Sequence, residues 1–190
     1  MKLDRVLDFA KLLLERAVQQ GDITVDGTMG NGHDTVFLAQ LVGETGHVYS
    51  FDIQEQAIHT TANKLETEHL QKPCTLVHDG HEQLDTYITV EHAGKITGAI
   101  YNLGYLPGGD KSIITQADTT IASLEKLFDM MAPEGIIVLV IYHGHPGGEA
   151  ERDALMHYVQ NLSQQKAHVL KYDFINQVHS PPFLIAIEKR

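Results

Sequence analysis

Three glycines follow a carboxylate in a pattern that suits nucleotide chemistry. Residues 23–34 read Ile-Thr-Val-Asp-Gly-Thr-Met-Gly-Asn-Gly-His-Asp, so the glycine order is G-x-x-G-x-G. Dinucleotide-binding folds carry G-x-G-x-x-G after their first strand instead. Asp26 at a strand end, followed by x-x-x-G-x-G, favours a site for S-adenosylmethionine (SAM), because glycine lets the backbone approach a ligand without a Cβ atom in between. Asp26 either anchors the turn or faces the amino-acid end of the ligand, and a turn without a ligand is the alternative.

A second acid stands where a ribose would lie. Asp52 ends the second predicted strand, 20 residues after Gly32. An acid at about this separation is the usual partner of ribose hydroxyls in nucleotide folds. Ile53 and Gln54 would then lie along the adenosine. The alternative is that Asp52 only caps the helix that follows.

A third acid extends the series. Asp79 follows the third predicted strand within the turn His-Asp-Gly-His. In SAM enzymes this turn borders the adenine, so Asp79 is the candidate for the adenine amino group. His81 is the candidate for stacking or hydrogen bonding beside it. A polar Asp-Gly turn without a ligand is the alternative.

The fourth predicted strand leads into a segment that suits methyl transfer to nitrogen. Asn102-Leu-Gly-Tyr105 resembles the Asn-Pro-Pro-Tyr loop of amino-directed methyltransferases, with Leu103 and Gly104 in place of the prolines. In such a loop the Asn side-chain oxygen and a following carbonyl accept hydrogen bonds from the substrate nitrogen and aim its lone pair at the methyl carbon. Tyr105 can stack on a planar base. The alternative is a plain strand-to-loop turn.

Two histidines follow the fifth predicted strand in the segment Tyr-His-Gly-His-Pro-Gly-Gly-Glu. We predict that His143, with His145 beside it, contacts substrate or acts as a general base, because an ammonium must lose a proton before it attacks. His-x-His with Glu149 is also compatible with zinc. No Cys or second His pair completes a zinc spacing, so we predict no metal. Solvated histidines in a Gly/Pro-rich loop are the remaining alternative.

Alternating strands and helices position these segments. The alternation predicts an α/β fold with a mostly parallel sheet and helices on both faces. The last two strands lack a helix between them, which predicts a reversed last strand in a seven-stranded sheet, the architecture of class I (Rossmann-like) methyltransferases. The predicted helices span residues 1–20, 36–42, 54–69, 82–92, 113–131 and 149–164. The predicted strands span residues 23–25, 47–51, 75–77, 96–101, 136–141, 168–174 and 183–188.

Composition limits the class of protein. The 190 residues suit one domain, 1–190, with helix 1–20 packed on it. No apolar run approaches about 18 residues, which predicts no membrane span, and one cysteine, Cys74, excludes an internal disulfide. We therefore expect a cytoplasmic protein. The net charge of −11 is unfavourable for binding nucleic acid, so an RNA substrate would need a local patch, shape, or a dimer that combines basic residues of two chains.

The whole chain resembles a known family. The resemblance rests on segments 26–35, Phe51-Asp52, 102–111 and 142–148. They are similar to the corresponding segments of the small bacterial class I SAM-dependent methyltransferases named "putative rRNA methylase". Within that family the chain resembles enzymes that methylate the aminomethyl group of 5-aminomethyl-2-thiouridine at the tRNA wobble position. The resemblance implies SAM as cofactor, the tRNA anticodon loop as partner, a homodimer, and neither DNA nor a membrane as partner.

The resemblance also implies roles for individual residues. The methionine end of SAM would be bordered by Gly30, Asn31, Gly32 and Asp34. The ribose and adenine would be bordered by Asp52, Gln54, Asp79 and His81, and the amine would be held by residues 102–105.

Three other functions remain open at this point. The first is methylation of another RNA, such as rRNA, or of a small-molecule or protein amine, which the acidic charge suits better. The second is a SAM-binding module without catalysis. The third is an NAD-dependent oxidoreductase, which the order of the glycines disfavours.

Overall fold

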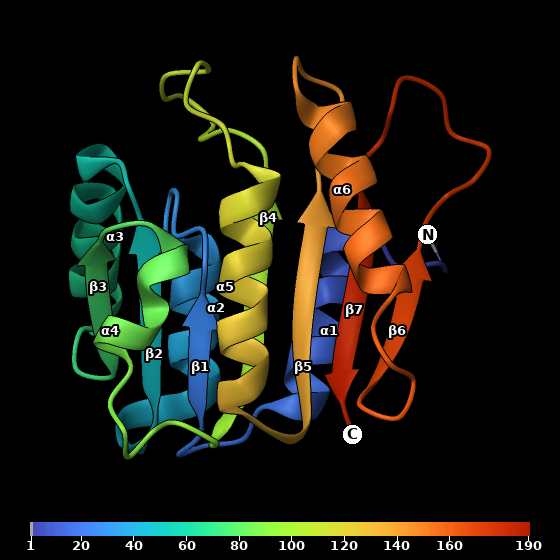
Figure 1. Cartoon of the computed structure of the whole chain (residues 1–190). Coiled ribbons are helices and arrows are strands. Elements are labelled where there is room, and N and C mark those ends of the chain that lie inside the picture. The colour runs from blue at the N-terminus through green and yellow to red at the C-terminus, as the bar shows by residue number, and fades with distance from the viewer. Residues whose placement is uncertain (1) are drawn as a thin grey trace.

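The computed structural model describes residues 2–190, and this part contains seven strands in one sheet of order β3-β2-β1-β4-β5-β7-β6 (Figure 1). The strands are β1 (Ile23–Asp26), β2 (His47–Asp52), β3 (Cys74–His78), β4 (Ile96–Leu103), β5 (Met131–Ile141), β6 (Ala167–Tyr172) and β7 (Phe183–Lys189). The helices are α1 (Val6–Ala17), α2 (His33–Val42), α3 (Glu55–Glu68), α4 (Leu84–Tyr87), α5 (Ala117–Met130) and α6 (Gly148–Gln160), with 3-10 turns η1 (Gly43–Thr45) and η2 (His81–Gln83).

The order of the strands reverses between β1 and β4. β1 pairs in parallel with β2 on one side and with β4 on the other. Ligands of open α/β sheets bind beyond the carboxyl ends of the strands at such a reversal, because the loops there diverge. β7 runs antiparallel to both β5 and β6, which confirms the predicted mostly parallel sheet with a reversed last strand.

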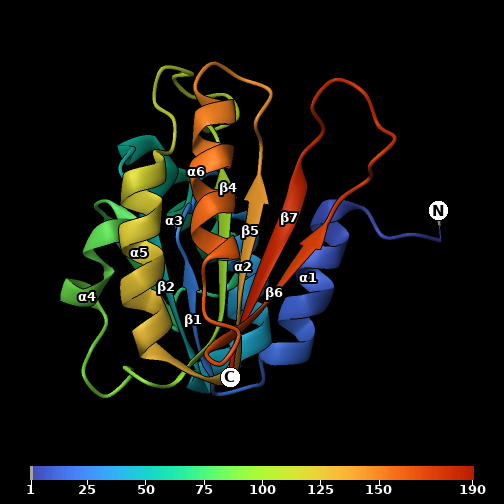
Figure 2. The ribbon, with the colours of Figure 1, turned by 45° about the vertical axis from the view of Figure 1, so that its right-hand side comes forward.

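Helices cover both faces of the sheet, which confirms the predicted fold class (Figure 2). α1, α2 and α3 pack on one face, where Leu38 and Leu65 are buried, and α4, α5 and α6 pack on the other, where Leu124 and Leu155 are buried. All four residues of β1 are buried, as expected for a central strand covered on both faces. This rigid centre carries the glycine turn.

Two predicted helices are longer than the structure shows. The N-terminal helix covers Val6–Ala17 rather than 1–20, and Met1 lies outside the described residues. The helix predicted over 82–92 ends at Tyr87, and Ile88 already has extended backbone with ψ 121°. The β-branched run Ile88-Thr89-Val90 explains the early end, because such side chains favour extended over helical backbone.

β5 begins five residues before the predicted start at 136. Ile96 of β4 pairs with Met131, whereas Gly98 pairs with Ile136, so the residues between them bulge from the ladder. Glu134 at the centre of the bulge has φ 65°. The predicted Pro-Glu-Gly turn therefore lies inside the strand rather than before it.

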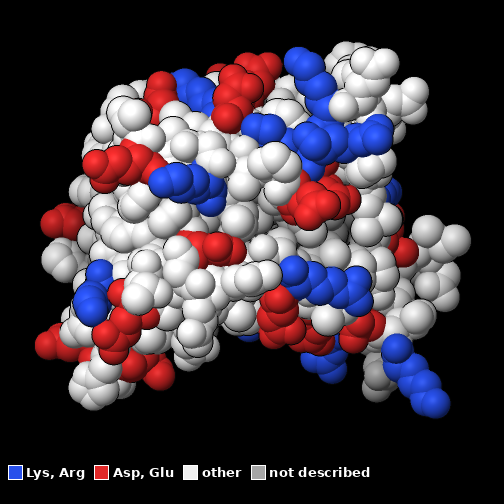
Figure 3. All heavy atoms as spheres, turned by 90° about the horizontal axis from the view of Figure 1, so that it is seen from below, with Lys and Arg blue, Asp and Glu red and all other residues white. Residues whose placement is uncertain are grey.

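The face at the amino ends of the strands carries charges of both signs. Lys and Arg side chains alternate there with Asp and Glu (Figure 3), so this face presents no single-sign field that would attract a polyanion. Within residues 2–190, no helix is long and apolar enough to cross a membrane.

Candidate functional site

The glycine turn after β1 is shaped by the protein's own packing. A Cβ on Gly27 would lie 2.1 Å from Cε1 of buried Tyr101, and one on Gly32 would lie 2.6 Å from Oγ1 of Thr61. Gly30 and Gly32 have φ of 51° and 75°, in the left-handed region that favours glycine. The turn leads into the N-terminus of α2, where backbone N–H groups and the helix dipole favour an anionic ligand group.

Replacing Gly27 with alanine is expected to destabilise the protein by about 2 kcal/mol, in the range of overpacked buried sites. The Tyr101 ring cannot move away from the new methyl group, because the ring is fully buried and its hydroxyl is hydrogen-bonded to Ser123 at 2.8 Å. Urea denaturation of the variant measures the loss. Gly94→Ala is the control, since a Cβ there meets nothing within 4 Å, although its positive φ adds a smaller strain. Equal stability of the two variants would contradict the prediction.

Asp26 anchors the turn from inside the protein. Its Oδ1 accepts a hydrogen bond from the Thr28 N–H at 3.1 Å, and its Oδ2 accepts one from the Thr35 hydroxyl at 2.6 Å. Burial first, and then the charge of Asp34, raise the pKa of this carboxyl to about 7. The structure thus supports the anchoring role of the two that the sequence allows.

Asp52 links the end of β2 to the glycine turn. Its Oδ2 accepts from the Gly30 N–H at 2.9 Å and its Oδ1 from the Gln54 N–H at 2.9 Å. Each oxygen keeps a lone pair for a further donor, which is the requirement for a ribose diol. The Ile53 side chain beside it is 57% exposed and offers an apolar surface to a planar ring.

Asp79 and His81 lie in the same turn, and His81 is the buried one of the two. Asp79 accepts from the Gly80 N–H at 2.8 Å and from the Tyr87 hydroxyl at 2.7 Å. His81 is buried, and its Nδ1 donates to the Gly27 carbonyl at 2.9 Å, so it supports the glycine turn from below. Burial lowers the pKa of His81, which keeps the ring neutral.

Asn102 is held in one orientation at the end of β4. Its backbone N–H donates to Oγ1 of Thr28 at 2.7 Å, and its Nδ2 donates to Oδ2 of Asp34 at 2.6 Å. In this bond the amide nitrogen faces Asp34, whose carboxyl oxygen accepts. The Asn102 oxygen is then directed elsewhere and can accept from a substrate N–H. Thr28 was missed in the sequence, where nothing distinguishes it from its neighbours.

Tyr105 lies at the open side of the same loop. Its side chain is 40% exposed, with Lys111 Nζ 5.7 Å from the ring centroid. The Asn31 amide donates to the Pro107 carbonyl at 3.2 Å, which ties the glycine turn to the loop that carries Tyr105. The structure therefore brings Asn31, Asn102 and Tyr105 to one edge of the sheet.

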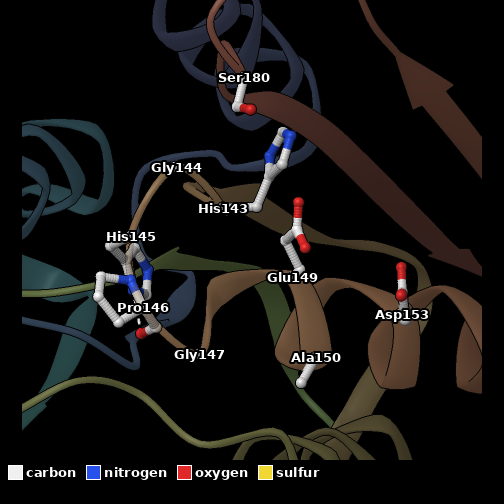
Figure 4. Close-up of a pocket in the computed structure, with 9 residues that line it drawn as sticks. All are labelled: His143, Gly144, His145, Pro146, Gly147, Glu149, Ala150, Asp153 and Ser180. Carbon is white, nitrogen blue, oxygen red and sulfur yellow. Dashed lines mark hydrogen bonds between the residues drawn. The ribbon is translucent and has the colours of Figure 1, made fainter.

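His143 lies farther along this edge, beyond β5. It lines a hollow of about 730 Å³ together with residues of the first turns of α6 and with Ser180. Figure 4 shows its ring extending toward Ser180, with Glu149 beside it, while His145 lies against Pro146. The ring of His143 also packs edge-on against Phe183, at 5.6 Å between centroids. Among the described residues no group of three or more His, Cys, Asp or Glu could hold a metal ion.

Known proteins are similar to this chain in sequence and in fold. The family model described as "Putative rRNA methylase" matches residues 48–188. The "tRNA (mnm(5)s(2)U34)-methyltransferase, chloroplastic" of Arabidopsis thaliana is 32% identical over 192 residues, which cover 97% of this chain and 70% of that protein. A crystal structure of a "putative rRNA-methylase" from Clostridium thermocellum is 41% identical, covers all of both chains and has a TM-score of 0.96. A "putative methyltransferase" from Streptococcus mutans, solved in complex with SAH, is 38% identical, covers 99% of both chains and has a TM-score of 0.90.

The reversed strand order, the glycine turn and the acid after β2 define a SAM-dependent methyltransferase of the class I, Rossmann-like type. Within that class the chain belongs to the rRNA_methylase family, whose model covers most of its length.

Proposed function

We propose that this enzyme transfers the methyl group of SAM to the aminomethyl nitrogen of 5-aminomethyl-2-thiouridine at the wobble position of tRNA. The orientation of Asn102 carries the proposal, because a side-chain oxygen presented at the carboxyl end of β4 accepts from an N–H donor. The 32% identical Arabidopsis relative, named for this tRNA position, supports the same substrate. When it is bound, SAM supplies an activated methyl group on a sulfonium.

The residues at the edge of the sheet fit such a cofactor. Gly30, Gly32 and the start of α2 form a cradle in which the backbone can approach the methionine end. We assign Asn31 and Asp34 to that end, and Gln54 and Asp79 to the ribose and adenine side, whereas His81 supports the glycine turn from within the protein. Tyr105 provides the stacking surface for the uridine, and His143 is a candidate contact with the substrate.

Docking on the anticodon loop must overcome the acidic charge of the chain. We propose that a homodimer combines basic residues of two chains at the RNA. Lys111 beside Tyr105 is the nearest cation to the proposed base-stacking position, and its contact with a phosphate would orient the wobble nucleotide.

The test uses tRNA from cells that lack this gene. The pure protein and SAM are incubated with this tRNA, and the nucleosides are then separated and weighed. One added methyl on 5-aminomethyl-2-thiouridine supports the proposal. An unchanged mass, with SAH binding confirmed by calorimetry, would contradict it and direct the search to rRNA, small amines or protein amines.

Replacing Asp52 with alanine is expected to weaken SAH binding about 10- to 150-fold. The carboxylate holds the Gly30 N–H and, as proposed, the ribose hydroxyls, and hydrogen bonds to a charged group contribute roughly 1.5–3 kcal/mol. Isothermal titration calorimetry measures the dissociation constant. Exposed Asp129→Ala is the matched control. Equal affinities in the two variants would remove Asp52 from the cofactor site.

A further inference from the structure

The proposed substrate brings a proton that the residues assigned so far cannot take. An alkyl amine near neutral pH is mostly an ammonium, which has no lone pair to attack a methyl carbon. The Asn102 oxygen accepts a hydrogen bond but does not act as a base. A proton acceptor must therefore face the amine.

His145 has an unpartnered ring nitrogen beside residues 102–105, which we call the catalytic loop. Its Nδ1 lies 3.1 Å from the Pro146 carbonyl, which can only accept, so Nδ1 carries the hydrogen and Nε2 is left as an acceptor. Nε2 is buried and has no hydrogen-bond partner among the described residues. It lies 3.7 Å from the position of a Cβ on Gly104, and the ring meets Tyr105 edge-on at 5.8 Å between centroids. This nitrogen thus borders the loop that carries Asn102 and Tyr105.

His143 is directed away from that loop. Its ring packs on Phe183 of β7 and extends toward Ser180 (Figure 4). β7 lies on the far side of β5 from β4. Of the two histidines, His145 is therefore the one beside the amine.

The carboxyl of Glu151 is buried next to the loop after β4. Glu151 of α6 is 5% exposed, and its Oε2 accepts from the Thr115 hydroxyl at 2.9 Å. The Thr115 N–H donates to the Gly104 carbonyl at 2.9 Å, so Glu151 is connected to the base of the catalytic loop. Burial raises the pKa of Glu151, and the hydrogen bond from Thr115 partly offsets this.

The other groups around His145 come from three elements. Tyr105 of the loop after β4 meets the His145 ring edge-on, and Lys111 of the same loop lies over the Tyr105 ring. Glu149 lines the hollow on the α6 side with His145, and Tyr142 precedes it at the end of β5.

We propose that Nε2 of His145 removes the proton from the substrate ammonium, an inference that rests on the proposed function. One N–H bond of the ammonium breaks, and its electron pair stays on nitrogen while the proton moves to Nε2. That pair then forms the N–C bond as the S–C bond of SAM breaks and its electrons remain on sulfur, which leaves SAH. The methylated amine departs as an ammonium, and His145 returns its proton to water.

The test measures single-turnover methyl transfer to tRNA that carries 5-aminomethyl-2-thiouridine, from pH 6 to 10. His145→Gly is expected to slow transfer at pH 7 by roughly 100-fold or more, within the range of general-base catalysis. The deficit should shrink as the pH rises and the amine loses its proton in solution. Added imidazole should restore the rate at least about tenfold, since it supplies the missing base. SAH affinity should stay within about twofold of wild type.

His179→Gly is the matched control, because His179 is exposed and its φ of 67° suits glycine. It should lose less than about twofold in rate and gain nothing from imidazole. His143→Gly is measured beside it. If His145→Gly does not fold, His145→Gln replaces it with the same pH readout.

Four outcomes would overturn the inference. A constant deficit at every pH without imidazole rescue would leave His145 a structural residue. Loss in His143→Gly instead would assign the proton to His143. Transfer by wild type with full activity of both His145 variants would refute the inference alone, whereas no transfer by wild type would refute the proposed function and the inference together.

Discussion

Replacing Asn102 with alanine is expected to slow methyl transfer by roughly 10²- to 10³-fold and to leave SAH affinity within about threefold of wild type. In the proposed function the side chain holds the substrate nitrogen in line with the methyl carbon, and loss of one well-placed polar partner of a reacting group costs about this much in rate. Thr28 keeps its bond from the backbone N–H of residue 102 in the variant, and Asp34 loses the bond from Nδ2 but stays fixed by its backbone in the first turn of α2. Single-turnover transfer on the modified tRNA and calorimetry with SAH measure the two quantities.

The control for this variant is Asn161→Ala, the same change at the exposed end of α6. It should alter neither rate nor affinity. A loss of SAH binding in Asn102→Ala that equals the loss of rate would mean that Asn102 serves the cofactor. Full activity would remove the amine-orienting role, and with it the observation on which the proposed function rests.

The sequence was sufficient for the order of the elements and for the edge of the sheet at which the site lies. Asp26, Asp52 and Asp79 each follow a strand of a parallel sheet, and parallel strands bring their carboxyl ends to one edge. That inference needs only the alternation of strands and helices. It places the three carboxylates without knowledge of their partners.

The partners could not be predicted, because they come from distant parts of the chain. Gly27 was interpreted as leaving space for a ligand, but a Cβ there would collide with Tyr101, 74 residues away. The contact of His81 with the Gly27 carbonyl likewise spans 54 residues. Local patterns identify a residue type that a turn requires, whereas the reason for that requirement depends on tertiary packing.

Glu151 shows the same limit for charged residues. On a helix its sequence neighbours are polar, and a charged residue in that setting is normally solvated. Its burial results from the loop after β4, which folds back so that Thr115 reaches α6. A signal for such a residue exists only in the three-dimensional structure.

The buried carboxyl of Asp26 should make the protein less stable as the pH rises. Its pKa of about 7 in the folded chain lies above the ordinary value of 3.8. Between these two values the folded chain holds a proton that the unfolded chain has released, so the free energy of unfolding falls with rising pH and levels off above about pH 7. This window follows from burial first and from the charge of Asp34 second.

The difference in free energy of unfolding between Asp26→Asn and wild type is therefore expected to shift in favour of the variant as the pH rises. The shift from pH 5 to pH 8 should be on the order of 3 kcal/mol. The amide oxygen still accepts from the Thr28 N–H, and the Thr35 hydroxyl can turn to accept from the amide nitrogen. Urea denaturation of both proteins at several pH values measures the difference, in which titrations common to the two chains cancel. Exposed Asp129→Asn should show no such trend. A difference that stays constant from pH 5 to pH 8 would mean that Asp26 is already ionised in the folded protein, and that its hydrogen bonds from Thr28 and Thr35 outweigh the cost of burying the charge.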